Sequence, residues 1–262
     1  MKGRDSMKKY IHIFGAAILV LLFWEALIQA GGYNEALFPS PGKVLTGFIE
    51  LINDGVLLAD IRSSLLRFAA GYLSSVLIAI FLGLILGWYR GIWAYLNPIA
   101  QVLRPISPMA WLPFIVLLFG IGEMPALVII FIAAFFPVLL ATVSAVANID
   151  PVYLKVAQNF GIRQPAVLTK IVLPAVFPSI ATGLHLALGT AWVFLVAGEM
   201  VGAQSGLGFL IIDARNNLRA DLLMAAIVVI GILGLVLDSL VHLLETWIYR
   251  RWGLQPERSH AA

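Results

Sequence analysis

A polar segment of 20 residues lies between two long apolar runs, and this arrangement limits the folds open to the chain. The run before it, Met124–Ala147, contains no charged residue, and the run after it, Ala175–Gly198, contains one titratable side chain, His185. A run of about 20 apolar residues is long enough to cross a bilayer as a helix. The segment between the runs, Lys155–Pro174, carries charges and side-chain amides that need water. The sequence therefore predicts two membrane crossings joined by a water-facing segment.

The composition places the whole chain in the same class. Of 262 residues, 61% are hydrophobic and 12% are charged, whereas a soluble domain carries about 25% charged residues. We expect an all-α membrane protein with a single transmembrane domain over residues 1–262. Six candidate spans cover residues 10–30, 65–89, 99–119, 125–147, 176–197 and 222–244. Pro105, Pro108 and Pro113 interrupt the third span, which we expect to be kinked and packed inside the protein.

The distribution of lysine and arginine predicts the orientation. One set of the segments between spans holds twelve of these residues and the other set holds five. The richer set marks the cytoplasmic side, so we expect both termini and Lys155–Pro174 in the cytoplasm of a bacterial cell, in a multi-pass protein of the inner membrane. The first span starts with basic residues, as a signal peptide does, but its apolar run is longer than a signal peptide requires. It is interpreted as an anchor.

Residues 37–60 are expected to form an amphipathic segment at the outer surface. Leu37–Pro41 reads as a rigid turn because each proline fixes its own φ and restricts the residue before it. The apolar residues that follow recur at helical spacing and are Val44, Leu45, Phe48, Leu51 and Ile52. In the second span, Gly83 and Gly87 are four residues apart, which predicts close packing against another helix.

Several kinds of chemistry have no motif in the sequence. There is no Walker-type phosphate loop, no Ser-based nucleophile elbow, no cysteine and no pair of histidines at metal-ligand spacing. The basic residues sit at the ends of apolar runs and do not form a nucleic-acid-binding surface. We therefore expect no catalytic residue, metal or cofactor in this chain, and any ATP to be bound by a partner subunit.

The segment Lys155–Pro174 resembles the EAA loop of bacterial ABC importer permeases. That pattern is E-A-A, three residues, G, nine residues and I-x-L-P. Five marked positions agree, namely Ala157, Gly161, Ile171, Leu173 and Pro174, whereas Lys155 and Val156 replace the first two residues.

The resemblance covers about residues 37–240 and is to the nitrate/sulfonate/taurine branch of these permeases. The matching segments are Leu37–Pro41, Ser64–Gly71, Arg104–Pro113, Phe119–Glu123, Gly183–Trp192, Glu199 and Gly206–Gly208. An arginine is usual in this branch where His185 stands.

The resemblance implies an importer-permease bundle of the MetI-like type, with a cytoplasmic coupling helix in a loop over residues 150–174. It implies two cytoplasmic ABC ATPase subunits, a second copy of the permease and an extracytoplasmic solute-binding protein as partners. The residues implied to couple to the ATPase are Lys155, Val156, Ala157, Gln158, Asn159, Phe160, Gly161, Ile162 and Arg163, and the loop ends at Ile171, Leu173 and Pro174. Lys155, Arg163 and Lys170 have an alternative role as residues that only set the orientation.

A second set of residues contains candidates for lining the solute pathway: Ser107, Pro108, Met109, Trp111, Pro113, His185 and Glu199. Prolines free backbone carbonyls, which are tolerated where they face a cavity, although the same prolines can serve a kink needed only for packing. His185 has the alternative of bonding a neighbouring helix. Glu199 has the alternative of a salt bridge to Arg67 or Arg215.

The expected function is that of a permease subunit of an ABC importer for nitrate, a sulfonate, taurine, bicarbonate or a related organic solute. A gradient-driven secondary transporter is one alternative, but it needs an acidic relay within the spans, and only Asp238 offers a start. An intramembrane enzyme is another, but it needs a nucleophile–base pair or metal ligands, which His185 alone does not supply.

Overall fold

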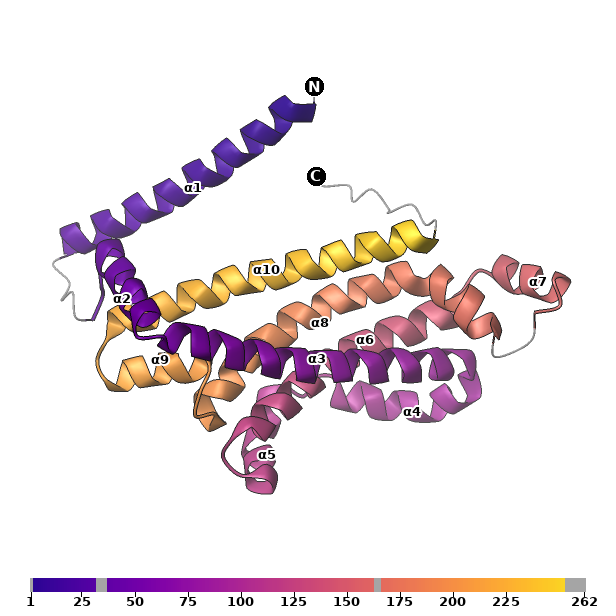
Figure 1. The fold of residues 1–262 in the computed structure, drawn as a ribbon. Coiled ribbons are helices and arrows are strands. Elements are labelled where there is room, and N and C mark those ends of the chain that lie inside the picture. The colour runs from indigo at the N-terminus through magenta and orange to yellow at the C-terminus, as the bar shows by residue number, and fades with distance from the viewer. Residues whose placement is uncertain (1, 32–36, 163–165, 253–262) are drawn as a thin grey trace.

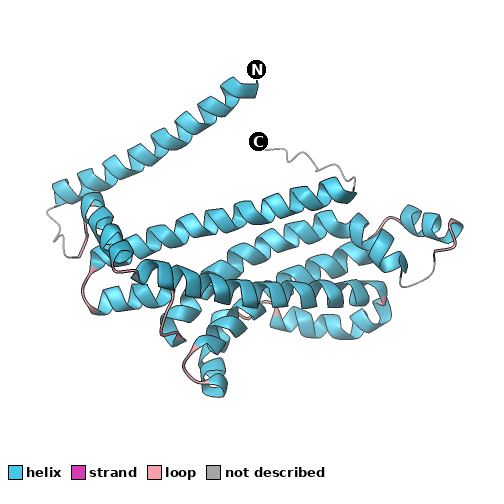
Figure 2. Ribbon diagram, in the orientation of Figure 1, coloured by secondary structure: helices cyan, strands magenta, loops and turns pink. Residues whose placement is uncertain are grey.

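The computed structural model describes residues 2–31, 37–162 and 166–252, in which all regular structure is helical (Figure 2). The α-helices are α1 (Lys2–Gly31), α2 (Pro41–Asn53), α3 (Val56–Trp88), α4 (Arg90–Leu103), α5 (Leu112–Phe119), α6 (Glu123–Ala147), α7 (Pro151–Asn159), α8 (Leu173–Gly202), α9 (Leu207–Asn216) and α10 (Ala220–Trp252). A short 3₁₀ helix, η1 (Pro108–Trp111), precedes α5, and a π-helix, η2 (Leu168–Val172), runs into α8.

The core consists of α3, α6 and α8, which lie side by side along the bundle (Figure 1). The contact between α3 and α6 is close because α3 presents glycines there. A Cβ at Gly83 would lie 2.6 Å from Thr142 Cβ, and one at Gly87 would lie 2.6 Å from Val146 Cβ. The two glycines predicted to pack against another helix therefore do so, and the helix they contact is α6.

The proline-rich third span is broken into two helices. Helix α4 ends at Leu103, and η1 with α5 continues in a direction that differs by 83°. Pro105 and Pro108 have no N–H to donate to the preceding turn, and the Ser107 hydroxyl accepts a hydrogen bond from the Met109 N–H at 3.3 Å, which starts the new helix. The sequence predicted one kinked span over 99–119; the structure divides it into two helical segments, and the first of them begins at Arg90.

Four helical segments in the described part of the chain are long and apolar enough to cross a membrane. They are α3, α6, α10 and the continuous helix η2–α8, and the bent pair α4–α5 raises the number to five. Helix α1 adds a shorter apolar stretch at Ile18–Gly31. An all-helical bundle of membrane-spanning length is therefore confirmed, whereas six crossings remain a prediction that depends on α1 and on the bent pair.

One end of the bundle is covered by α2 and α9 together with the first turns of α3 and α10 (Figure 1). Helix α2 begins where Ser40 Oγ accepts the Lys43 N–H and Pro41 fills its first turn. Its apolar side chains differ in exposure: Val44 and Leu51 are buried, whereas Leu45 and Ile52 are exposed. The expected amphipathic segment over 37–60 is shorter in the structure, since residues 56–60 belong to α3, and α9 was not predicted.

An ion triad joins α2 to the start of α10. The Arg219 guanidinium donates to the Glu50 carboxylate at 2.6 and 3.0 Å and to the Asp221 carboxylate at 2.8 and 3.0 Å. Hydrogen bonding from Arg219 lowers the pKa of the Glu50 carboxyl below its ordinary value, and the two carboxylates raise the pKa of Arg219.

Candidate functional site

The short helix α7 lies beyond the opposite end of the bundle from α2 and α9 (Figure 1). It begins where the Asp150 carboxylate accepts the Val152 N–H at 2.8 Å. It ends at Asn159, and two residues later Gly161 has a φ of +64°. The Ile162 N–H donates to the Ala157 carbonyl at 3.0 Å. This bond pattern is a Schellman motif. A Cβ on Gly161 would meet nothing within 4 Å, so the backbone angle alone favours glycine there.

Helix α7 has one face toward the bundle and one away from it. Ala157 is 2% exposed and joins the core cluster, and Leu154 and Ile162 pack against that cluster. On the outer face Val152, Val156 and Phe160 are 60%, 45% and 80% exposed. Residues four apart form a row along a helix, so we call Val152, Val156 and Phe160 the α7 row. An apolar row open to solvent on a short projecting helix has the form of a docking surface.

The remaining predicted coupling residues surround this row. Lys155, Gln158 and Asn159 are exposed on α7. Arg163 lies outside the described residues. Val152 was not among the sequence candidates, and its four-residue spacing from Val156 is the pattern that reveals it.

The return from α7 to the bundle is anchored by packing. Ile171 and Leu173 contact the core cluster, Val172 within η2 is fully buried, and Lys170 is exposed. Pro174 lies in the first turn of α8, but η2 precedes it in the same helix, so Pro174 does not restart the helix. Because η2 and α8 form one continuous helix, a displacement of η2 is transmitted directly to α8.

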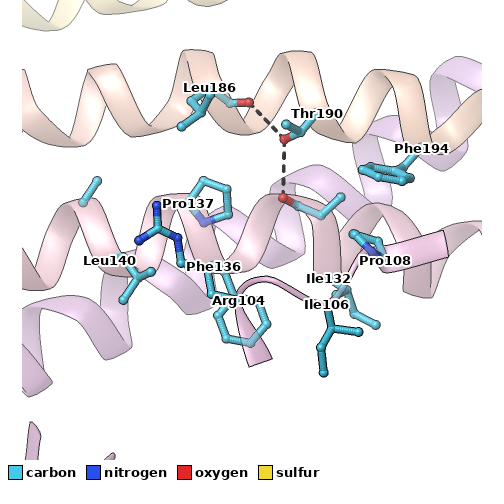
Figure 3. A pocket seen from close by; sticks show the side chains of 12 residues that line it. Arg104, Ile106, Pro108, Ile132, Phe136, Pro137, Leu140, Leu186, Thr190 and Phe194 are labelled. Atoms are coloured by element: carbon cyan, nitrogen blue, oxygen red, sulfur yellow. Dashed lines mark hydrogen bonds between the residues drawn. The ribbon is translucent and has the colours of Figure 1, made fainter. Parts of the chain in front are cut away.

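A cavity of about 400 Å³ lies between the broken third span and the helices α6 and α8 (Figure 3). Most of its lining is apolar and includes Ile106, Pro108, Phe136, Leu186 and Phe194; the polar groups of Arg104 and Thr190 also line it. The Thr190 hydroxyl is engaged with backbone, 2.9 Å from the Leu186 carbonyl oxygen and 3.4 Å from that of Ala133. Among the described residues that line this cavity, Arg104 is the charged one.

The sequence candidates from the third span occupy different places around the break. Pro108 lines the cavity, and Ser107 caps η1. Met109 and Trp111 pack against a small cluster of α5 and α6 residues. Pro113 is exposed near the start of α5. Arg104 was not among the candidates, although it stands at the first proline of the motif.

Glu199 lies at the far end of α8 in a buried network and is 0% exposed. Its carboxylate accepts from Arg67 Nη1 at 2.8 Å, from the Gly208 N–H at 2.9 Å and from the Ser64 hydroxyl, whose Oγ lies 2.8 Å from each carboxylate oxygen. Arg67 was one of the two partners that the sequence offered for Glu199. Arg67 also donates to the carbonyl and hydroxyl oxygens of Ser205, at 2.8 and 2.6 Å.

The same network holds the beginning of α9. The N–H groups of Gly206 and Leu207 donate to Asp60 at 2.7 Å and to Ser64 Oγ at 2.9 Å. Side chains of α3 and α8 therefore satisfy the first amides of α9, which lack partners inside the helix. Gly206 has a φ of +105°, and a Cβ there would overlap the Glu199 carboxylate and the Arg67 guanidinium. This accounts for the Gly206–Gly208 motif.

His185 joins α8 to α10. Its Nδ1 lies 3.0 Å from an oxygen of Asp238 and its Nε2 lies 2.9 Å from an oxygen of Glu245. A hydrogen bond to a neighbouring helix was one of the two roles that the sequence offered for His185. The same side chain borders a shallow groove on α8 with Gly189 and Val193.

A bundle of membrane-spanning helices from which α7 projects with an exposed apolar row is the architecture expected of a membrane permease that docks onto a partner. A family model described as the binding-protein-dependent transport system inner membrane component matches residues 75–253. The chain belongs to this family, and the resemblance to the nitrate/sulfonate/taurine branch is confirmed.

Two curated relatives match over most of their length. A putative ABC transporter permease of Methanocaldococcus jannaschii is 36% identical over 232 residues, which is 87% of this chain and 86% of the relative. A putative aliphatic sulfonates transport permease of Bacillus subtilis is 31% identical over 247 residues, which is 94% of this chain and 90% of the relative. An inward-facing structure of the MetNI methionine ABC transporter shares the fold at 17% identity and a TM-score of 0.52, covering 72% of this chain and 96% of the other. The chain is therefore a permease subunit of the ABC importer class.

Proposed function

We propose that this permease carries a small anionic solute of the sulfonate, nitrate or bicarbonate kind into the cytoplasm, and that an ATPase gripping α7 drives the transport. The chain supplies the membrane passage and the lever, and ATP binds to the partner subunit. On this proposal the chain has no catalytic activity of its own.

The observation that carries the proposal is the α7 row on a helix that projects from the bundle. Phe160 is 80% exposed beside Gly161, at the end of the helix farthest from its start. When a partner covers a large apolar side chain of this exposure, the burial stabilises the complex by roughly 1.5–3 kcal/mol. Because η2 and α8 form one continuous helix, a movement of the docked α7 row can be passed through this helix into the bundle.

The choice of an anion rests on the cavity at the broken span. Arg104 places a positive charge at a cavity whose other lining is mostly apolar, and a cation in such surroundings attracts a small anion more strongly than it would in bulk water. The curated relative in Bacillus subtilis is named for aliphatic sulfonates, which are anions.

The solute pathway in this proposal follows the break and the adjoining face of α8. Ser107, Pro108, Met109, Trp111 and Pro113 contribute the segment at the break. His185 borders the same face of α8 through the groove it lines. Glu199 is enclosed in the present conformation and becomes part of the pathway only when its network opens.

The proposed assembly contains two copies of the permease, two ATPase subunits on the cytoplasmic side and a solute-binding protein on the outer side. Both termini and α7 face the cytoplasm of a bacterial cell with the permease in the inner membrane. The excess of basic residues on that side supports this orientation.

The test is to replace Phe160 by Asp and to measure both ATPase co-purification and solute uptake. We expect at least a tenfold loss of each, because a carboxylate on the α7 row loses its water on docking. Leu218→Asp is the matched control, since Leu218 is also highly exposed, at 77%, but follows α9 at the other end of the bundle. This control should retain its ATPase.

Gly161→Val tests the shape of the turn separately. Valine is strained at a φ of +64°, so the variant should insert in the membrane and bind ATPase poorly. Uptake that survives in cells without the ATPase would overturn the proposal, as would full ATPase binding by Phe160→Asp.

A further inference from the structure

His185 of α8 converges with His242 and Glu245 of α10, although His185 lies 57 positions before His242 in the sequence. His185, His242 and Glu245 each offer one ligand atom, and these atoms all lie within 4.8 Å of one another. The Glu245 oxygen Oε2 is 2.9 Å from His185 Nε2 and 3.7 Å from His242 Nδ1. Ligand atoms around a tetrahedral zinc ion, with bonds of about 2.0–2.2 Å, lie roughly 3.3 Å apart. Small side-chain rotations would bring the three atoms to that spacing.

Asp238 gives His185 the orientation of a metal ligand. Its carboxylate lies 3.0 Å from His185 Nδ1, on the side of the ring opposite Glu245. A metal-binding histidine commonly donates its second ring N–H to a carboxylate, which fixes the tautomer and leaves the other nitrogen as the ligand. In this cluster the nitrogen left for the ion is Nε2, which faces Glu245.

Glu245 carries an unsatisfied oxygen. The residue is 6% exposed, and its Oε1 has no hydrogen-bond partner among the described residues. The nearby Tyr72 hydroxyl donates to the Leu184 carbonyl at 2.8 Å and so does not supply the missing bond. A buried carboxylate oxygen without a partner is costly, and a cation bound by both oxygens of the Glu245 carboxylate would satisfy it.

The net charge of the cluster also favours a bound cation. Asp238 and Glu245 place two carboxylates on a membrane-spanning helix, and a protonated His185, with one ring nitrogen facing each, compensates only one of their two negative charges. Such a charge is expensive in hydrocarbon surroundings unless it is compensated. One divalent cation compensates it fully, and the nitrogen ligands favour a first-row transition metal over Mg²⁺ or Ca²⁺.

We propose that His185, His242 and Glu245 bind one Zn²⁺ ion, with Asp238 positioning His185. The sequence predicted no metal because no two histidines stand at ligand spacing, but the fold brings together residues 57 positions apart in the chain. The side chain of His242 is 72% exposed, so the fourth position of the ion is open to water or to an exchanging ligand. The ion ties α10 to α8, the helix that continues from the coupling segment.

The test uses the full-length permease, purified with a tag that contains no histidine and placed in lipid nanodiscs. Zn²⁺ alone is titrated by equilibrium dialysis, and Co²⁺ serves as the absorbing probe. We expect one Zn²⁺ per chain and a Co²⁺ spectrum typical of tetrahedral coordination. His242→Ala and Glu245→Gln should each weaken Zn²⁺ binding at least tenfold, and Asp238→Asn should weaken it about 10- to 100-fold. His260→Ala, which removes a histidine outside the described residues, is the matched control and should bind as the wild type does.

Zn²⁺ should also raise the melting temperature of the wild type and leave that of His242→Ala unchanged. The melting temperature without metal shows that His242→Ala is folded, and the exposure of its side chain makes this variant the mildest of the set. Less than one Zn²⁺ per wild-type chain would overturn the site. Equal Zn²⁺ affinity in the wild type and His242→Ala would also overturn it. Because binding is measured on the permease alone, this result is independent of ATPase docking and uptake.

Discussion

Glu199 Oε1 accepts a hydrogen bond from Arg67 Nη1 at 2.8 Å, and the two side chains are 0% and 4% exposed. The pair joins α8 to α3, and both side chains are buried. Removing one member of a buried pair leaves the other charge uncompensated and costs about 3–5 kcal/mol. We expect Arg67→Met to lower the melting temperature strongly. Arg62→Met, five residues earlier on α3 with an exposed side chain, is the control, and equal melting temperatures for the two variants would contradict the assignment.

The turn into α9 makes a second prediction about this network. Gly206→Ala should destabilise the protein by about 3 kcal/mol, because it adds the strain of a left-handed residue to the overlap with Glu199 and Arg67. Gly55→Ala is the matched control. Gly55 has a φ of +72° and nothing within 4 Å of an added Cβ, so it should cost only about 1 kcal/mol. Thermal unfolding of the two variants measures the difference, and similar losses would show that the overlap is relieved at no cost.

Leu218 offers a stabilising change. It follows α9 with a φ of +55° and is 77% exposed, so its side chain gives little packing in return for a strained backbone. Leu218→Gly should raise the free energy of unfolding by about 1 kcal/mol. The melting temperature should rise accordingly, and a fall would mean that the leucine side chain is held by a contact in the membrane or the assembly.

The ion triad of Glu50, Arg219 and Asp221 predicts a dependence of stability on pH. The pKa of Glu50 is lowered in the folded protein by Arg219, so its contribution is present above the unfolded pKa of about 4.3 and is lost as the pH falls through the lower folded pKa. Wild type should therefore melt at a higher temperature than Glu50→Gln near pH 6, and the two should converge under strongly acidic conditions. A gap that persists below the folded pKa would exclude this ion pair as its cause.

The position of Arg104 at the cavity leads to a prediction about the uptake of anionic solutes. Arg104→Gln should reduce uptake of an anionic solute about tenfold or more, because it removes the positive charge at the cavity beside the broken span. Arg104→Lys should retain most of the uptake, and both variants should co-purify the ATPase normally. Equal loss in the glutamine and lysine variants would indicate that the guanidinium shape, and not its charge, is required.

The parts of the fold that could be predicted from the sequence are those that depend on residues close together in the chain. Long apolar runs predicted the helices of the core, and the four-residue spacing of Gly83 and Gly87 predicted the close contact within it. The 83° bend was not predictable, because prolines show where a helix breaks but only packing decides in which direction the chain continues. Counting charges offered both Arg67 and Arg215 to Glu199, and only the packing of α3 on α8 decides between them.

The sites that depend on distant residues were the hardest to predict. Helix α9 begins where it does because Asp60, Ser64 and Glu199 receive its first N–H groups, and two of these residues come from a helix about 140 positions earlier. The approach of His185 to His242 is equally invisible in the sequence, since it requires α10 to lie in one register along α8.

The close contact between α3 and α6 has a consequence for how this protein can change shape. At Gly83 and Gly87 each backbone rests directly on a side chain of α6, so sliding one helix past the other would force atoms into overlap. The two helices must therefore travel as one rigid body. Relative movement is then left to other joints of the bundle, such as the 83° bend between α4 and the pair η1–α5.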